Sequence, residues 1–161
     1  GTKVAALLMF IADVNALGLE VAQGLVMTES FYWDLNDRTR AFTARVRPRL
    51  QNGQMPNMVT AGNYSATLHY LKAVAEMGVP AAKASGVDTI NRMKAMPTED
   101  EAFGRNSIRA DGRHMIPSYL FEVKSPAESR GPWDYMKVLQ TTPADEAWRP
   151  LSEGACPLVR S

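Results

Sequence analysis

The first 30 residues carry two apolar runs that predict β-strands. The run at residues 4–10 is apolar without alternation, which is typical of a strand that is buried on both faces. A second run covers residues 24–30, and residues 16–23 between the two runs are expected to form a short helix or a loop. The polar residues Asp13 and Asn15 follow the first run and are therefore expected in the loop at the end of its strand.

The second run leads into three successive aromatic residues, Phe31, Tyr32 and Trp33. Polar residues that can start a helix follow at Asp34 and Asn36. A strand that brings aromatic side chains to its carboxyl end and then turns into a helix is the layout of an open α/β sheet, in which ligands bind outside the carboxyl ends of strands. A second interpretation stays open, in which these aromatic side chains pack in the core or at a hinge.

Three helices are expected in the middle of the chain. The first starts at Asn36 or Asp34 and ends near residue 49, the second spans residues 57–77, and the third spans residues 86–96 with Ser85 as its cap. Apolar residues at spacings of three and four predict the inner face of the second helix: Ala61, Tyr64, Leu68, Leu71 and Ala75. The inner face predicted for the third helix consists of Val87, Ile90 and Met93.

The last third of the chain is predicted to contain strands and turns. Residues 99–101 are acidic and are expected to form a solvated loop. Asp111-Gly112 is a strong signal for a hairpin turn, because glycine takes positive φ without penalty. The remaining predicted elements are two strands and one helical turn, at residues 119–124, 135–140 and 145–148.

Length and charge narrow the class of protein. A chain of 161 residues is long enough for one core and too short for two full α/β domains. The formal net charge of +1 gives no electrostatic reason to expect nucleic acid as a partner. The longest apolar run, Val4 to Ala12, is well short of the roughly 20 residues that span a bilayer. Because the chain opens with Gly and enters an apolar run almost at once, we expect it to be a piece of a longer protein.

The residues that usually carry catalysis are scarce. The two histidines, His69 and His114, lie in no HExxH pattern, and the chain contains no GxSxG, phosphate-binding loop or GxGxxG motif. The one cysteine, Cys156, is either free or paired with a residue outside this chain. We therefore expect no enzyme activity, no metal and no cofactor, although a hydrolase or transferase that uses Cys156 remains an alternative.

Four stretches together resemble a known family: LLMFIADVNALGLEVAQGLVMTESFYWDLND, AGNYSATLHYLKAV, FGRNSIRADGR and YLFEVKSPAESRGPWDYMKV. They are similar to the carboxyl-terminal half of periplasmic solute-binding proteins of ABC importers, in the branched-chain amino acid (leucine/isoleucine/valine-binding) class. The resemblance covers essentially the whole chain in one order. It implies the α/β fold of that class, a type I periplasmic-binding-protein-like three-layer αβα architecture, of which this chain is an incomplete carboxyl-terminal fragment.

The resemblance also implies how the chain is divided between the two lobes of that fold. Residues 1–30 correspond to the end of the second lobe, residues 31–124 supply helices and a hairpin to the first lobe, and residues 125–161 return to the second. Each piece is then expected to expose a face meant for absent strands. The missing amino-terminal half, or self-association, would cover those faces.

Ligand-binding residues follow from the resemblance, position by position. Asp13 takes the place of a carboxylate that meets a ligand ammonium group, although it could equally cap the following turn. Asn15 could supply an amide to the same ligand. Tyr32 and Trp33 lie where the family places aromatic side chains that line the cleft. Tyr64 is a weaker candidate, because it also fits the apolar stripe of its helix.

The function implied is binding rather than catalysis. A small amino acid or an aromatic carboxylate would be held between two closing lobes and delivered to the membrane permease of an ABC importer. The protein would then be exported to the periplasm, with its signal peptide outside this chain. The alternative is a ligand-sensing domain of the same fold in signalling or transcription.

Overall fold

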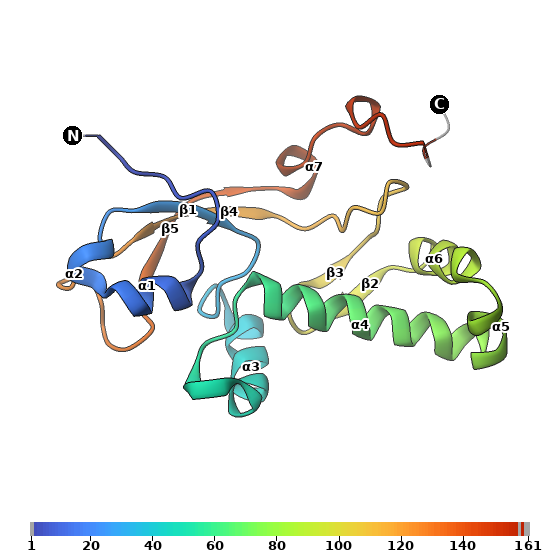
Figure 1. Ribbon diagram of the computed structural model, residues 1–161, viewed down its shortest axis with the longest axis horizontal. Helices are drawn as coiled ribbons and strands as arrows, with labels where there is room; N and C mark the ends of the chain where they lie inside the picture. Colours follow the sequence, from blue (N-terminus) through green and yellow to red (C-terminus); the bar gives the residue numbers. More distant parts are fainter. Residues whose placement is uncertain (1, 158, 160–161) are drawn as a thin grey trace.

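A three-stranded antiparallel sheet organises one part of the molecule, seen in the computed structural model that describes residues 2–157 and 159. The strands lie in the order β1 (Val26–Glu29), β4 (Ser118–Val123) and β5 (Met136–Thr142). Two short helices, α1 (Ile11–Leu17) and α2 (Leu19–Ala22), pack beside this sheet (Figure 1). These strands confirm the predictions for residues 24–30, 119–124 and 135–140, and α1 and α2 show that the segment between the first two apolar runs is helical.

The other part of the molecule is built around one long helix. Figure 1 shows α4 (Met58–Met77) running away from the sheet, with α5 (Val79–Ala84) and α6 (Gly86–Ala95) at its far end. The remaining elements of this part are α3 (Asp37–Val46), the 3-10 turns at Arg47–Arg49 and Gln51–Gly53, and the hairpin of β2 (Thr98–Asp100) and β3 (Gly104–Asn106). Near the carboxyl terminus lie α7 (Ala144–Ala147) and a 3-10 turn at Leu151–Glu153.

Local capping explains why three helices begin where the sequence predicts. The Asn36 side chain accepts a hydrogen bond from the Thr39 N–H at 3.1 Å, and Asn57 accepts from the N–H groups of the first turn of α4. Ser85 accepts from the Asp88 N–H at 3.1 Å at the start of α6. Each cap satisfies amides that a helix leaves without an intrahelical partner. Between α4 and α6 lies α5, a short helix that was not predicted.

The predicted buried strand at residues 4–10 is wrong. Only Ala5 forms a bridge, in parallel with Val26, and Leu7 and Leu8 are 103% and 73% exposed. The segment pairs along one edge of β1, and no described element covers its outer side. An apolar run becomes a buried strand only where neighbours pack on both faces, and those neighbours are not among the described residues.

The long helix also buries a different face from the one predicted. Its buried side chains recur every four residues and are small or polar: Ala61, Ser65, His69 and Ala73. Leu71 is 55% exposed, so the stripe predicted from the larger apolar residues was wrong beyond its first turns. The prediction for α6 was wrong in the same way, because Thr89 is its buried residue while Val87 and Ile90 are exposed.

The acidic residues at 99–101 do not form a simple loop. Glu99 and Asp100 belong to β2, and the Asp100 side chain accepts hydrogen bonds from the N–H groups of Ala102 and Phe103 at 2.8 and 2.7 Å. This aspartate therefore shapes the turn of the β2–β3 hairpin. The predicted turn at Asp111-Gly112 is present and is closed by a bridge between residues 108 and 114.

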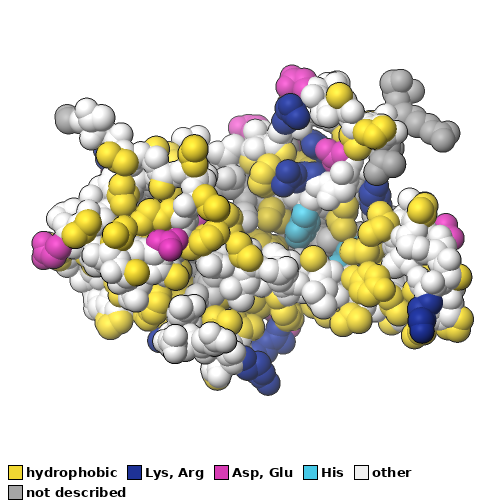
Figure 2. Space-filling view, viewed as in Figure 1, with side chains coloured by type: hydrophobic (Ala, Val, Ile, Leu, Met, Phe, Trp, Pro, Cys, Tyr) yellow, Lys and Arg dark blue, Asp and Glu magenta, His cyan; other side chains and the backbone are white. Residues whose placement is uncertain are grey.

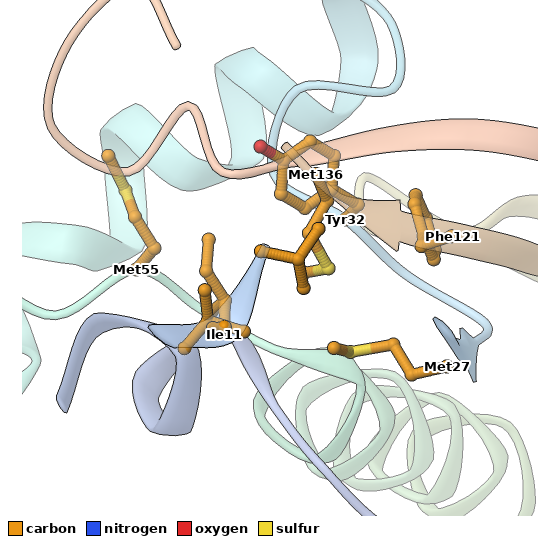
Figure 3. Packing of buried hydrophobic residues seen from close by; sticks show 9 residues of the cluster. Ile11, Met27, Tyr32, Met55, Phe121 and Met136 are labelled. Carbon is orange, nitrogen blue, oxygen red and sulfur yellow. The ribbon is translucent and has the colours of Figure 1, made fainter. Parts of the chain in front are cut away.

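Two clusters of buried apolar side chains hold the parts together. The first lies at the sheet and gathers α1, α2, β1, β4 and β5; Figure 3 shows six of its members, Ile11, Met27, Tyr32, Met55, Phe121 and Met136. The second lies between α3, α4 and the β2–β3 hairpin, around Phe31 and Phe42. Trp33 packs against both clusters. The Phe31-Tyr32-Trp33 segment therefore joins the two cores. None of the described helices is long and apolar enough to cross a membrane.

Candidate functional site

Four aromatic residues meet where the chain passes between its two parts; we call Tyr32, Trp33, Trp133 and Tyr135 the aromatic crossing. The Tyr32 hydroxyl and the Trp33 indole N–H both donate to the main-chain carbonyl of Trp133, at 3.1 and 2.9 Å. These contacts join segments about 100 residues apart. The crossing thus depends on a backbone oxygen that accepts two hydrogen bonds, as a carbonyl with two lone pairs can.

Asn15 joins the same group through Tyr135. The Tyr135 hydroxyl donates to the Asn15 side-chain oxygen at 3.0 Å, and the rings of Trp133 and Tyr135 lie 5.8 Å apart. The Asn15 side-chain oxygen is therefore engaged. The two N–H donors of the same amide could each donate a hydrogen bond to a ligand. Three of the predicted site residues, Asn15, Tyr32 and Trp33, are brought together here.

Tyr32 and Trp33 differ in what they can offer a ligand. Tyr32 is only 4% exposed, and its ring packs 5.5 Å from that of Phe121. Burial raises the pKa of the Tyr32 hydroxyl to about 12, so it stays a neutral donor. Trp33 is half-buried, so it is more accessible than Tyr32. Of the two, Trp33 is the one whose side chain a solute could reach, and Tyr32 is buried in the core beside it.

Asp13 lies in the first turn of α1 rather than in a loop. Its carboxylate accepts a hydrogen bond from the Phe10 N–H at 2.7 Å, and the side chain is exposed. The capping role weighed for Asp13 from the sequence is therefore present, at the start of the helix rather than in the turn after it. A ligand contact by Asp13 stays a prediction.

Tyr64 is separate from the aromatic crossing. Its ring lies 5.1 Å from that of Phe42, and its hydroxyl donates to the Glu101 carboxylate at 2.6 Å. The Arg45 guanidinium donates to the same hydroxyl and forms an ion pair with Glu101 at 3.0 Å. Tyr64 therefore bridges α4 to the β2–β3 hairpin and to α3, and its ligand role also stays a prediction.

Glu29, which the sequence analysis did not single out, is a buried acid at the end of β1. It is 2% exposed; one carboxylate oxygen accepts from the Met58 N–H at 3.4 Å and the other has no partner. Burial raises the pKa of Glu29 to about 8, and the charge of Asp13 adds to this shift. The signal that could have revealed it is its place in a strand whose alternate residue, Met27, is also buried.

An apolar groove of about 350 Å³ runs along α4. Its walls come from α4, α6, the β2–β3 hairpin and residues 108–116, and it includes both histidines. Figure 2 shows histidine side chains in a hollow between α4 and the carboxyl-terminal segment. The His69 Nε2 lies 2.8 Å from the Met93 carbonyl, and His114 Nε2 lies 2.9 Å from the Thr98 hydroxyl. Burial lowers the pKa of His114, which favours the neutral imidazole.

Groups that could hold a metal do not converge in the described part of the chain. No set of three or more histidine, cysteine, aspartate or glutamate residues comes together there. Cys156 is half-buried beside Arg109, Arg113 and Trp148, and it forms no disulfide within the described residues.

Comparisons with known proteins decide the family. The sequence model of the periplasmic binding protein family matches residues 1–131. The chain belongs to the periplasmic binding protein family. A periplasmic binding protein from Burkholderia mallei is 40% identical over 99% of the chain, with a TM-score of 0.87. A branched-chain amino acid ABC transporter periplasmic ligand-binding protein from Burkholderia xenovorans is 36% identical over 98% of the chain, with a TM-score of 0.81.

More distant structures of the family share the fold alone. The leucine-, isoleucine-, valine-, threonine- and alanine-binding protein from Brucella ovis is 18% identical over 92% of the chain, with a TM-score of 0.71. This chain covers 40% of each Burkholderia protein and 38% of the Brucella protein. No curated protein sequence matches it. The resemblance drawn from the sequence and the type I periplasmic-binding-protein-like α/β fold, present here as a part of that fold, are confirmed.

Within this periplasmic binding protein, sequence reasoning missed the element that organises the crossing. Trp133 and Tyr135 lie in the quoted stretch GPWDY, but no periodicity marks them. Gly131-Pro132 predicts a turn before the strand at residues 135–140, but it does not indicate what the turn contacts. The hydrogen bonds from Tyr32 and Trp33 end on the backbone oxygen of Trp133, and a pattern of side chains does not predict such a contact.

Proposed function

We propose that this chain forms part of the solute-binding component of an ABC importer. The observation that carries the proposal is the 36% identity, over 98% of the chain, to a protein described as a branched-chain amino acid ABC transporter periplasmic ligand-binding protein. The solute would be a small amino acid or an aromatic carboxylate, and the partner would be the membrane permease of the importer. This role places the protein in the periplasm.

The division of the chain between two lobes is part of the same proposal. Residues 1–30 and 125–161 would belong to the second lobe and residues 31–124 to the first. The two apolar clusters support such a division, since one surrounds the sheet and the other surrounds α4. The pairing of β4 with both β1 and β5 favours a boundary before Ser118 rather than after Lys124.

The aromatic crossing would form one wall of the solute cleft. Trp33 would present its open ring face to an apolar or aromatic side chain of the solute, with Tyr32 beneath it. A rigid aromatic side chain buries ligand surface at small entropic cost. Asn15 would donate its amide to a polar group of the solute, and Asp13 would meet an ammonium group.

The apolar groove along α4 would have another role. Several polar side chains of its lining are hydrogen-bonded, namely His114, Lys94 and the Nε2 of His69, while the buried His69 Nδ1 has no partner among the described residues. The chain covers 40% of the length of its Burkholderia relatives. The proposal is that the rest of a two-lobed protein, or a second copy of this chain, packs over the groove, as exposed apolar surface of this kind generally requires.

A chimera tests solute binding. The matching segment of the Burkholderia mallei protein is replaced by this chain, and the purified chimera is titrated calorimetrically with L-leucine, L-valine, L-phenylalanine and benzoate. We expect saturable binding of at least one probe, with a preference for the aromatic ones. Trp33→Ala should weaken that binding by roughly tenfold or more, about 1.4 kcal/mol.

The matched control for this experiment is Trp148→Ala. Trp148 donates its indole N–H to the Ile116 carbonyl at 2.8 Å and takes no part in the hydrogen bonds of the aromatic crossing. Its loss should leave the affinity within about twofold. Equal effects of the two substitutions, or a folded chimera that binds none of the four probes, would contradict the proposal.

A further inference from the structure

Residues 124–134, which we call the Trp133 loop, form a tightly tied turn between β4 and β5. The Glu128 carboxylate accepts hydrogen bonds from the Ser125 N–H and hydroxyl at 2.8 and 3.0 Å. At the other end, the Asp134 N–H donates to the Gly131 carbonyl at 3.2 Å. The loop therefore has internal contacts at both of its ends, and its backbone conformation is specified locally.

Trp133 has an unusual backbone conformation within this loop. Its φ is +71°, in the left-handed region that large side chains rarely adopt. Such outliers persist where the surrounding structure determines them, and they cluster at functional sites. The conformation directs the Trp133 carbonyl toward Tyr32 and Trp33, which are the two donors to this oxygen.

The next residue, Asp134, anchors the loop. It is 6% exposed and accepts hydrogen bonds from the Arg130 N–H and Nε at 2.9 and 3.1 Å, and from the Lys124 ammonium. Burial opposes its ionisation, but the hydrogen bonds from Arg130 and Lys124 outweigh this and hold the pKa of Asp134 well below its usual range. An ionised carboxylate with several donors is a strong local constraint on the backbone beside it.

The same loop also contacts the residue that follows Trp33. Arg130 forms an ion pair with Asp34 at 3.4 Å, while Asp34 pairs with Arg40 at 2.8 Å at the start of α3. The loop thus reaches the aromatic pair through the Trp133 carbonyl and reaches the next residue through Arg130. Arg130 is largely exposed, so the carbonyl is the better protected of the two links.

We propose that Trp133 is a positioning residue: its main-chain carbonyl, held in the left-handed conformation by the Asp134 anchor, fixes the rings of Tyr32 and Trp33. The Trp133 side chain contributes less than its backbone. In the solute-binding role proposed above, on which this part of the inference rests, the loop sets the orientation of the Trp33 wall. Small displacements of such groups have large effects on binding and chemistry.

Two substitutions of Trp133 distinguish the contribution of its backbone from that of its side chain. Trp133→Gly and Trp133→Pro both delete the indole, but glycine adopts positive φ freely and proline is confined to about −65°. The readout is the hydrogen-exchange rate of the Trp33 indole N–H, followed by NMR in the chain labelled with ¹⁵N-tryptophan. Trp133→Gly should leave this rate within about threefold, and Trp133→Pro should raise it by roughly tenfold or more.

An internal reference and a matched control keep the test decisive. The Trp148 indole N–H, which also donates to a backbone carbonyl, should keep its rate in both variants. Asp134→Ala should accelerate exchange at Trp33, whereas Asp111→Ala should not, although Asp111 is likewise held by an arginine, at 2.7 Å. If Trp133→Pro does not fold, the Trp33 exchange rate is compared between Asp134→Ala and Arg130→Gln, a conservative change of an exposed side chain.

The inference is overturned if the Gly and Pro variants accelerate Trp33 exchange equally, or if Trp33 and Trp148 always change together. Because this readout needs no solute, it stands or fails independently of the proposed function. In the Burkholderia chimera, with the best-binding of the four probes, Trp133→Pro should weaken affinity by at least roughly tenfold and Trp133→Gly by less than about threefold. Faster Trp33 exchange in Trp133→Pro with no loss of affinity would remove only the proposed link to binding, whereas unchanged Trp33 exchange in Trp133→Pro would overturn the inference itself.

Discussion

The aromatic crossing and the apolar groove are opposite cases of how one chain buries its side chains. At the crossing, segments about 100 residues apart supply donors and acceptors to each other, and Tyr32 is 4% exposed. Along the groove, α4 and α6 face a hollow of about 350 Å³, and Ile90 in its lining remains 47% exposed. The crossing is complete within this chain, whereas the groove retains apolar surface that folding has not covered.

The difference teaches where the stability of this chain resides. Apolar area adds to the free energy of unfolding, by roughly 25 cal/mol per Å², only where a partner surface buries it. The core around Phe121 has such partners from both ends of the chain, whereas the exposed side chains of α6 lack them in the described residues, as do Leu7 and Leu8 at the edge of the sheet. Substitutions should therefore have large effects in the core around Phe121 and small ones beside the groove.

The largest expected effect comes from the core beside the crossing. Phe121 is fully buried, with its ring 5.5 Å from Tyr32 and 6.1 Å from Tyr119. Phe121→Ala should lower the free energy of unfolding by about 3–5 kcal/mol, through lost burial and a cavity. The matched change beside the groove, Val87→Ala, should stay within about 0.5 kcal/mol. Urea unfolding followed by fluorescence measures both changes in unfolding free energy. Similar losses in the two variants would contradict the proposed difference between the two regions.

The second prediction concerns the buried acid between the two parts. Burial raises the pKa of Glu29 from 4.5 to about 8, so the folded state keeps a proton that the unfolded state releases. This contribution to stability is fully present below pH 4.5 and is lost as pH rises toward 8, with a slope of up to about 1.4 kcal/mol per pH unit.

Glu29→Gln should remove that slope, because glutamine stays neutral. At pH 7 the variant should be more stable than the parent chain by as much as roughly 3 kcal/mol. Unfolding free energies measured between pH 5 and 8 test this. The test is the difference in unfolding free energy between Glu29→Gln and the parent chain, because His114 contributes a slope of opposite sign to both. A difference that stays constant from pH 5 to 8 would show that Glu29 is ionised in the folded protein.

The sequence predicts best those features that are determined within a few residues. Asn36, Asn57 and Ser85 each cap a helix that was expected from the sequence, since a cap needs only the amides of the following turn. The strands at 24–30, 119–124 and 135–140 were also found, because their partners lie within this chain.

Features that depend on distant or absent partners could not be predicted. The run at residues 4–10 has the composition of a buried strand but pairs on one edge only. On α4 the buried face follows His69 and Ser65, whose polar atoms bond to α6 and β2 rather than following hydrophobicity. Of the candidate site, sequence reasoning found Asn15, Tyr32 and Trp33 but could not foresee that the carbonyl of Trp133 joins the two aromatic residues.

A third prediction compares two helix caps. The Asn57 side chain accepts from the N–H groups of Val59 and Thr60, both at 3.0 Å, at the end of α4 nearest the sheet. Asn57→Ala should destabilise the chain by about 1 kcal/mol. Ser85→Ala at α6, beside the groove, should cost less, because fraying of a peripheral helix need not involve global unfolding. Amide hydrogen exchange distinguishes the two, and global acceleration by Ser85→Ala would contradict this view.

The smallest expected effect is at Tyr64, a predicted site residue outside the crossing. Tyr64→Phe keeps the ring on Phe42 and removes only the hydroxyl that bridges Arg45 and Glu101. Because Arg45 and Glu101 are each about half exposed and remain paired directly, the loss should be at most about 1 kcal/mol. Added salt should shrink the difference further, since exposed ion pairs are screened. In the chimera, Tyr64→Phe should leave solute affinity unchanged if Tyr64 is a structural bridge. A clear loss of affinity at unchanged stability would instead show that Tyr64 contacts the solute.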